Sequence, residues 1–223
     1  MRLLYHTSLS PACRKIRMIL AEKGLGFRLQ TQNPWEEHSS AFLNLNPLGE
    51  VPVMVEENGE VIVGNYAITE YLEEKHPSPN FIGRTLSEKA EIRRLVDWFD
   101  GRFERDVSHK LLTEKVFKRL ARKGAPDTNA LREGKRNIDY HLDYIVYLTE
   151  HQPWLAGDSL TLADIVAGAH ISAMDYLGDV PWNHFPEAKQ WYAVLKSRPS
   201  FRAILADRTA GILPPAYYDN PDF

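Results

Sequence analysis

The residues best suited to bind a ligand lie in a turn near position 50. An apolar, helix-like run ends at Leu45, and residues 46–49, Asn-Pro-Leu-Gly, have turn chemistry. Val51-Pro52 then opens a short strand, because proline cannot donate to a sheet ladder and belongs at a strand's start. A cis Val51-Pro52 bond would leave the Val51 N–H and C=O unpaired and able to grip a peptide-like ligand by strand addition. A plain loop that enters a strand fits the same residues.

A second candidate lies at the start of the first predicted helix, where Ser10-Pro-Ala-Cys13 forms the turn. Pro11 favours the first helical turn, which makes Ser10 the N-cap. Redox chemistry would need a partner cysteine, and the chain has only Cys13, so a small buried core residue is the better interpretation of Cys13. Tyr5, on the preceding strand, is a weaker candidate than Ser10 to activate a nucleophile.

The pattern of the first half predicts the order strand, helix, strand, helix, strand, strand, helix. We expect strands over residues 2–6 and 27–30, a helix over 11–23, and a second helix from Pro34 to about Leu45. Glu57-Asn58-Gly59 indicates a hairpin between two further strands, and Asn65 can cap a third helix. This order is typical of a thioredoxin-like α/β unit whose first two strands run parallel.

The second half is predicted to be all-helical. Residues 1–76 form the thioredoxin-like domain, 77–86 a linker, 87–208 a helical bundle and 209–223 an extended tail. Helices are expected from Ser87 to about 120, from Asp127 or Thr128 to about 150, and over 163–177. Thr161 and Asp164 form a capping box that starts the last of these. Two prolines, Pro186 and Pro199, fit first helical turns.

Composition excludes several classes of function. Hydrophobic residues make up 43% and charged residues 26% of the 223 residues, as in ordinary globular proteins. The formal net charge of −3 does not favour nucleic acid or membrane as a partner. No apolar run approaches the roughly 20 residues that span a bilayer. The single cysteine and the start of the chain, which does not resemble a signal peptide, predict a cytoplasmic protein. We expect no metal site.

Two motifs give the chain a resemblance to the glutathione transferase superfamily. They are Asn46-Pro-Leu-Gly-Glu-Val-Pro52 and, in the helical half, Thr161-Leu-Ala-Asp164. The resemblance implies that the Val51-Pro52 bond is cis and that the Val51 backbone binds the cysteinyl part of glutathione. It also implies that Ser10 serves the glutathione sulfur, because a hydroxyl donor and a helix N-terminus both favour the reactive thiolate. The N-cap function would require the same serine, so both interpretations stay open.

The chain departs from the family pattern at the third helix. The family's Glu/Asp-Ser-x-Ala-Ile run, which holds the γ-glutamyl group, is Gly64-Asn-Tyr-Ala-Ile68 here. Asn65 can still donate to a carboxylate, but nothing local replaces the acid that would bind the amine. Losing such a partner typically costs about 1.5–3 kcal/mol. We therefore expect no required cofactor, with glutathione at most a weak ligand or cosubstrate.

Further segments are similar to a bacterial branch of transferase homologues that includes a division protein that binds FtsZ. They include Trp98-Phe-Asp-Gly-Arg-Phe103, Leu177-Gly-Asp-Val-Pro-Trp182 and the tail from Pro214 to Phe223. This resemblance implies a dimeric, non-enzymatic binder of the filament protein FtsZ. The alternative is a cytoplasmic glutathione transferase that conjugates small electrophiles through Ser10. A glutathione-dependent redox module is the weakest interpretation.

Seven residues are candidates for partner binding. Trp35 sits beside the expected groove, either as an exposed anchor or packed under a helix. Lys118 and Arg119 belong to a basic run that is either a solvated helix face or a patch for an acidic peptide. The tail contributes Tyr217, Tyr218, Asp222 and Phe223.

Overall fold

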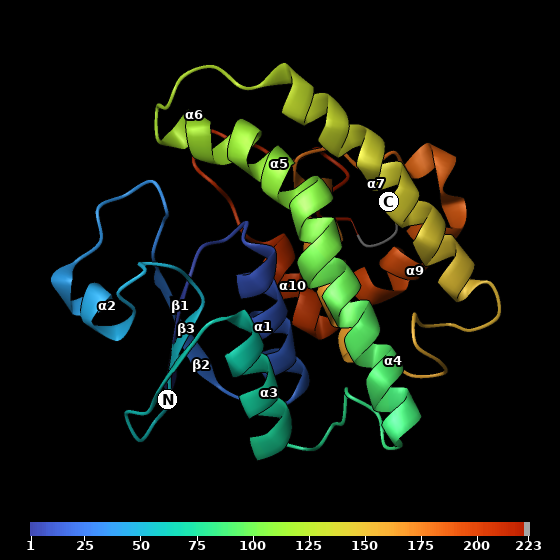
Figure 1. Ribbon diagram of the computed structural model, residues 1–223, viewed down its shortest axis with the longest axis horizontal. Coiled ribbons are helices and arrows are strands. Elements are labelled where there is room, and N and C mark those ends of the chain that lie inside the picture. Colours follow the sequence, from blue (N-terminus) through green and yellow to red (C-terminus); the bar gives the residue numbers. More distant parts are fainter. Residues whose placement is uncertain (221–223) are drawn as a thin grey trace.

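The computed structural model describes residues 1–220, and its first half is built on a four-stranded sheet (Figure 1). The strand order is β2-β1-β3-β4. The strands are β1 (Arg2–His6), β2 (Phe27–Thr31), β3 (Val53–Val55) and β4 (Val61–Val63). β1 and β2 are parallel, whereas β3 is antiparallel to both of its neighbours. The predicted thioredoxin-like half is confirmed, because β2 follows a crossover helix and the hairpin completes the other edge.

Three helices accompany the sheet, α1 (Pro11–Glu22), α2 (Ser40–Leu45) and α3 (Asn65–Lys75). The predicted start of the second helix at Pro34 was wrong. The chain makes a turn there, with Glu36 N–H donating to Asn33 C=O, and α2 begins only after Ser39, whose hydroxyl accepts from the Phe42 N–H. The predicted cap of α3 was wrong by one residue. Gly64, at φ +95°, holds the N-cap position, and this left-handed backbone suits glycine.

The second half is helical, as predicted, and opens with one long helix that is continuous from Leu86 to Leu120. Its segments are α4 (Leu86–Asp97), η1 (Trp98–Ser108), α5 (His109–Leu112), η2 (Thr113–Phe117) and α6 (Lys118–Leu120). η1 and η2 have π-helical hydrogen bonding, a form that often marks functional sites. The remaining helices are α7 (Thr128–Thr149), α8 (Leu162–Tyr176), the 3₁₀ turn η3 (Trp182–His184), α9 (Pro186–Lys196) and α10 (Pro199–Leu205).

Helix α8 is the centre of the core, since every one of its residues is buried. Gly168 allows α9 to approach closely, because a Cβ at this position would lie 2.1 Å from the Leu195 Cδ2. The predicted capping box is present, with the Asp164 carboxylate accepting from the Thr161 N–H at 3.0 Å. Helix α1 packs against α8 and α10, so the sheet half docks on this core.

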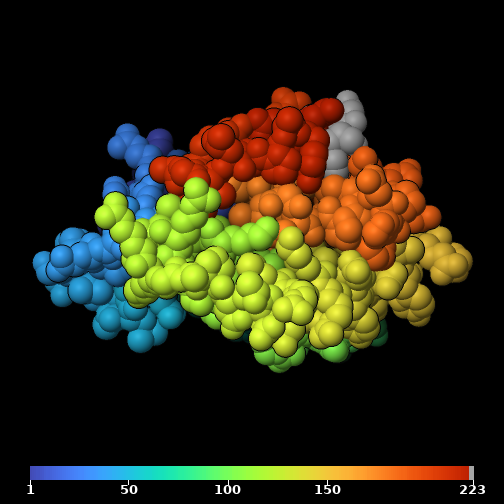
Figure 2. Space-filling view, turned by 90° about the horizontal axis from the view of Figure 1, so that it is seen from above, coloured from blue at the N-terminus to red at the C-terminus, as the bar shows by residue number. Residues whose placement is uncertain are grey.

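Between α10 and Asn220 the tail is not helical, as expected. It makes an isolated bridge between Thr209 and Ile212 and then a series of turns up to Asn220. Figure 2 shows this red segment along one side of the molecule, beside the yellow-green end of the long helix and blue atoms of the sheet half. The tail therefore spans both halves of the chain.

Candidate functional site

The turn before β3 has the geometry that the sequence predicted. The Val51-Pro52 peptide bond is cis, and Pro52 C=O accepts from the Gly64 N–H at 3.1 Å. Within residues 1–220, neither the N–H nor the C=O of Val51 has a hydrogen-bond partner, and the residue is half-buried. The Val51 backbone therefore offers one donor and one acceptor to a ligand.

Ser10 is the N-cap of α1. Its hydroxyl accepts from the Cys13 N–H at 3.3 Å, and the residue has an extended backbone. A hydroxyl that accepts one bond can still donate one, so the cap does not exclude a bond to a thiolate. Cys13 is fully buried, and burial raises the pKa of its thiol to about 11, although the Ser10 hydroxyl opposes this shift. Cys13 is thus an inert core residue, as its sequence position indicated.

The charge missing from the start of α3 is supplied by a distant residue, Asp100 of η1. Asn65 Nδ2 donates to Asp100 Oδ2 at 3.1 Å, across 35 positions of sequence. The same oxygen accepts from Lys15 Nζ of α1 at 2.6 Å. As expected, no residue near Asn65 in the sequence replaces the family's acid. Asp100, however, places a carboxylate beside Asn65 in space. The Lys15 side chain is only 1% exposed, so a buried ammonium of the protein itself already pairs with this carboxylate.

Two more groups fix the orientation of Asp100. His170 Nε2 lies 3.3 Å from Asp100 Oδ1, and His170 Nδ1 lies 2.9 Å from the Ser108 hydroxyl. These distances fit a tautomer that donates Nε2–H to Asp100 and accepts from Ser108. Burial raises the pKa of Asp100, but Lys15 and His170 more than offset it and hold the value at about 2. Asp100 is therefore a carboxylate at neutral pH, with both oxygens engaged inside the protein.

Trp35 joins the two halves of the chain. Its half-buried ring lies 6.0 Å from the ring of Phe117 at the end of the long helix. Trp35 is therefore partly packed. It is neither the fully exposed anchor nor the fully packed ring that the sequence left open. Lys118 follows Phe117 directly and pairs with Glu114 at 2.6 Å, whereas Arg119 is exposed. Three of the predicted partner-binding residues are thus gathered around the end of this helix.

The tail residues have different environments. Tyr218 is fully buried, with its ring 5.2 Å from that of Tyr176, so it belongs to the core while the tail keeps this path. Tyr217 is half-buried and lines a cavity of about 410 Å³ with Trp182 and His184, and burial raises its pKa to about 12. Two further predicted residues, Asp222 and Phe223, lie outside the described residues.

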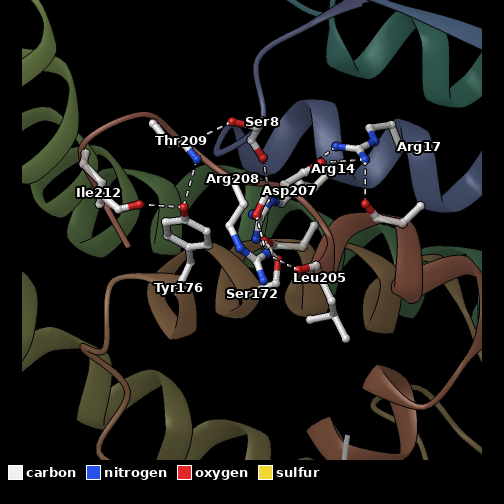
Figure 3. Close-up of polar contacts among 12 residues, drawn as sticks. Ser8, Arg14, Arg17, Ser172, Tyr176, Leu205, Asp207, Arg208, Thr209 and Ile212 are labelled. Carbon is white, nitrogen blue, oxygen red and sulfur yellow. Dashed lines mark hydrogen bonds and ion pairs between the residues drawn. The ribbon is translucent and has the colours of Figure 1, made fainter. Parts of the chain in front are cut away.

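Hydrogen bonds hold the tail at the junction of the two halves (Figure 3). The Tyr176 hydroxyl donates to Ile212 C=O at 2.7 Å and accepts from the Thr209 N–H at 2.9 Å. The Thr209 hydroxyl also lies 3.0 Å from that of Ser8, in the turn before α1. One tyrosine therefore secures both ends of the bridge that starts the tail.

Just before the tail, Asp207 fixes helix α1 to the helical half. Arg17 donates to both of its carboxylate oxygens, at 2.6 and 3.0 Å, and also to Ala203 C=O (Figure 3). Such a bidentate pair is among the stronger polar contacts in proteins. Arg14, also from α1, is fully buried and donates to Ser172 of α8 at 2.8 Å.

Family models and known proteins match the chain over most of its length. The glutathione S-transferase N-terminal domain matches residues 4–80, and the glutathione S-transferase C-terminal domain matches residues 107–208. This chain belongs to the glutathione transferase family. The likeness extends to the helical half, so it does not rest on the thioredoxin-like fold alone.

Two comparisons point to one relative. The chain is 48% identical over 225 residues to the FtsZ-localized protein A of Caulobacter vibrioides, covering 100% of this chain and 98% of that protein. The solved structure named FzlA from C. crescentus has a TM-score of 0.95 at 48% identity, with 100% and 99% of the two chains covered. A solved structure described as a glutathione S-transferase from Rhodospirillum rubrum F11 is similarly close, with a TM-score of 0.97, 49% identity and full coverage of both chains.

The sequence did not identify the Lys15–Asp100 pair. Its one signal was Asp100 within the aromatic run of residues 98–103, an acid between residues that pack in the core. Within the part of the chain that is described, no three His, Cys, Asp or Glu side chains gather as ligands of a metal ion would. No helix over residues 1–220 is both long and apolar enough to cross a membrane.

Proposed function

We propose that this protein is a transferase-fold binding protein that associates with the filament protein FtsZ in the cytoplasm and does not act as an efficient conjugating enzyme. The observation that carries the proposal is the likeness, over the full length of this chain, to the protein named FtsZ-localized protein A. The engagement of Asp100 by Lys15 supports the second part, because a glutathione amine would compete with an ammonium of the protein itself.

The proposed contact surface lies at the end of the long helix and along the tail. The half-buried Trp35 ring lies 6.0 Å from the ring of Phe117, two residues before the exposed Arg119, so this end of the helix offers an aromatic ring and a positive charge. Aromatic and arginine side chains dominate the energy of protein interfaces. Asp222 and Phe223, which the sequence predicts as partner-binding residues, are the further contacts that we propose.

Co-sedimentation with FtsZ filaments assembled with GTP tests the proposal. We expect the full chain to pellet with filaments in a saturable way and to stay in solution without them. A truncation after Asn220 removes Asp222 and Phe223 but keeps the buried Tyr218, so its melting temperature should match the full chain while its binding falls. A larger deletion from Ile212 would remove core residues and confound the result. A full chain that never pellets with filaments rules out the proposal.

We also propose a homodimer, formed through an aromatic surface of η1 and α7. Trp98 packs on Tyr140 and Tyr144, with ring centroids 5.9 and 4.5 Å away, and Tyr144 stacks on Tyr147. Tyr140 is 52% exposed and Tyr147 70% exposed. A row of aromatic rings across two adjacent helices, with the two tyrosines of α7 exposed, is typical of a surface that a partner covers.

A conjugating enzyme remains the second candidate, because Ser10 and the unpaired Val51 backbone keep the geometry that a thiol peptide would need. In that case Ser10→Ala should reduce conjugation of a model electrophile at least tenfold. Equal activity of the two proteins would remove Ser10 from this function.

A further inference from the structure

A cavity of about 660 Å³ lies between the end of the long helix and the tail, and we name it the basic groove. Its helical wall carries Lys115, Lys118, Arg119 and Arg122. Spacings of three and four residues place Lys118 and Arg119 on the same side of the helix as Lys115, and Arg122 follows just after the helix ends at Leu120. The red tail runs beside this yellow-green end of the long helix in Figure 2 and forms the opposite wall.

The charge of the basic groove is only partly neutralised. Among the described residues that line it, Glu114 is the one carboxylate, and it pairs with Lys118 at 2.6 Å. Lys115 pairs with Asp179, also at 2.6 Å. Within residues 1–220, the side chains of Arg119 and Arg122 have no hydrogen-bond or ion-pair partner. Since the whole chain has a net charge of −3, this concentration of positive charge is a local feature that favours an anionic ligand.

The other wall of the basic groove is apolar. It is formed by Leu177, Ile212 and Leu213, and the Leu213 side chain is 85% exposed. The bond from the Tyr176 hydroxyl to Ile212 C=O holds this part of the tail in place. An exposed leucine that faces arginines suits a ligand with both apolar and acidic groups.

We propose that the basic groove binds an acidic peptide segment that carries at least one large apolar side chain. The carboxylates pair with Arg119 and Arg122, and the apolar side chain packs on Leu213. The proposal deepens the proposed function and rests on it for its biological setting, since a filament protein is one source of such a segment. A bilayer carries its charge on a broad surface and does not enter a groove between a helix and a tail.

Fluorescence anisotropy with a designed probe tests this inference without FtsZ. The probe is a labelled peptide of aspartate and glutamate with two leucines. One control peptide replaces each acid by lysine, and another replaces each leucine by serine. We expect saturable binding of the probe, at least tenfold weaker binding of both control peptides, and weakening of probe binding from about 0.05 M to about 0.5 M salt.

Variants of the groove locate the binding site. Arg122 has a left-handed backbone, φ +54°, which glycine adopts without strain, so Arg122→Gly should keep the fold while it weakens probe binding. Arg119→Glu and Leu213→Ser should each weaken binding at least tenfold. Lys123→Glu is the matched control, since Lys123 is exposed and adjacent but does not line the groove. It should change the affinity less than twofold.

The outcomes separate this inference from the proposed function. Equal losses of probe affinity for Arg119→Glu and Lys123→Glu would show general charge attraction and would overturn the basic groove as the binding site. Binding to phosphatidylglycerol vesicles without binding to the probe would overturn it as well. Probe binding by a chain that does not pellet with FtsZ filaments would support the groove and reject FtsZ as the partner. If the chain does not bind the probe, and Arg119→Glu does not change its pelleting with filaments, FtsZ is supported as the partner and the groove is rejected as the binding site.

Discussion

At the scale of single residues, Lys15 is the basis of our prediction that glutathione binds this chain weakly at most. Its ammonium lies 2.6 Å from the Asp100 carboxylate, and this carboxylate also accepts from Asn65. The resemblance to the family's motif at the start of the third helix predicted Asn65 as a ligand-binding residue. It could not predict the pair, because Lys15 and Asp100 lie 85 positions apart and meet only when the two halves dock.

Replacing Lys15 by methionine should destabilise the fold by about 3 kcal/mol, because Asp100 would be left as a largely buried charge without its partner. The value is at the lower end of the usual range because the Asp100 side chain is 20% exposed. Adding Asp100→Asn should recover most of the loss, since the amide carries no charge. Urea denaturation of the single and double variants measures the loss of stability and its recovery. Additive losses would mean that the two groups are not coupled.

The buried histidines should make stability depend on pH. Burial lowers the pKa of His141, and likewise that of His6, to about 4 in the folded state. Between about pH 6.5 and pH 4 the unfolded chain therefore binds protons that the folded chain does not, so stability falls as the pH falls. In this range each histidine changes the free energy of unfolding by up to about 1.4 kcal/mol per pH unit.

His141→Gln tests this account, because glutamine keeps an acceptor for the Trp98 indole N–H, which donates to His141 Nδ1 at 3.1 Å. Denaturation at several pH values between about 4.5 and 7.5 should give a shallower pH dependence for the variant than for the wild type. The same slope for both proteins would contradict the assignment of a neutral, buried His141.

At the scale of elements, the sequence was most informative where the local chemistry alone decides the structure. Pro11 and Ser10 define the start of α1, and the Thr161–Asp164 capping box starts α8, because each needs only near neighbours. The start of α2 was predicted too early, since Pro34 suits a turn as well as a helix. The path of the tail could not be predicted, because its prolines exclude a helix without specifying what the chain packs against.

The Tyr176 hydroxyl should control the order of the tail. Tyr176→Phe keeps the buried ring but leaves the Thr209 N–H and Ile212 C=O without this partner, at a cost of about 1–3 kcal/mol. Hydrogen exchange over residues 207–218 should become faster, while exchange in α8 away from residue 176 stays slow. Unchanged exchange in the tail would show that other contacts hold it.

At the scale of the whole molecule, the predicted organisation as a thioredoxin-like half and a helical half is confirmed, because periodicity and turn residues are repeated over long segments. The assembly is not decided by such patterns. The homodimer that we propose depends on exposed side chains, and the aromatic surface of η1 and α7 becomes visible only in the folded structure.

The proposed dimer should dissociate when this surface is made polar. We expect the wild type to have about twice the chain mass of 25.6 kDa in solution, and Tyr140→Asp to shift it towards the monomer. Light scattering coupled to gel filtration measures both. Tyr66→Asp is a control of the same chemistry, at another exposed tyrosine that is outside the aromatic surface. A wild type of monomer mass would contradict the dimer.

Calorimetric titration with millimolar glutathione at neutral pH tests the central claim most directly, namely that the groove of this transferase fold is engaged by the protein's own residues. Lys15 already holds Asp100, so we predict no detectable heat of binding for the wild-type chain. A dissociation constant in the micromolar range would contradict the claim and would make Ser10-dependent conjugation the leading function.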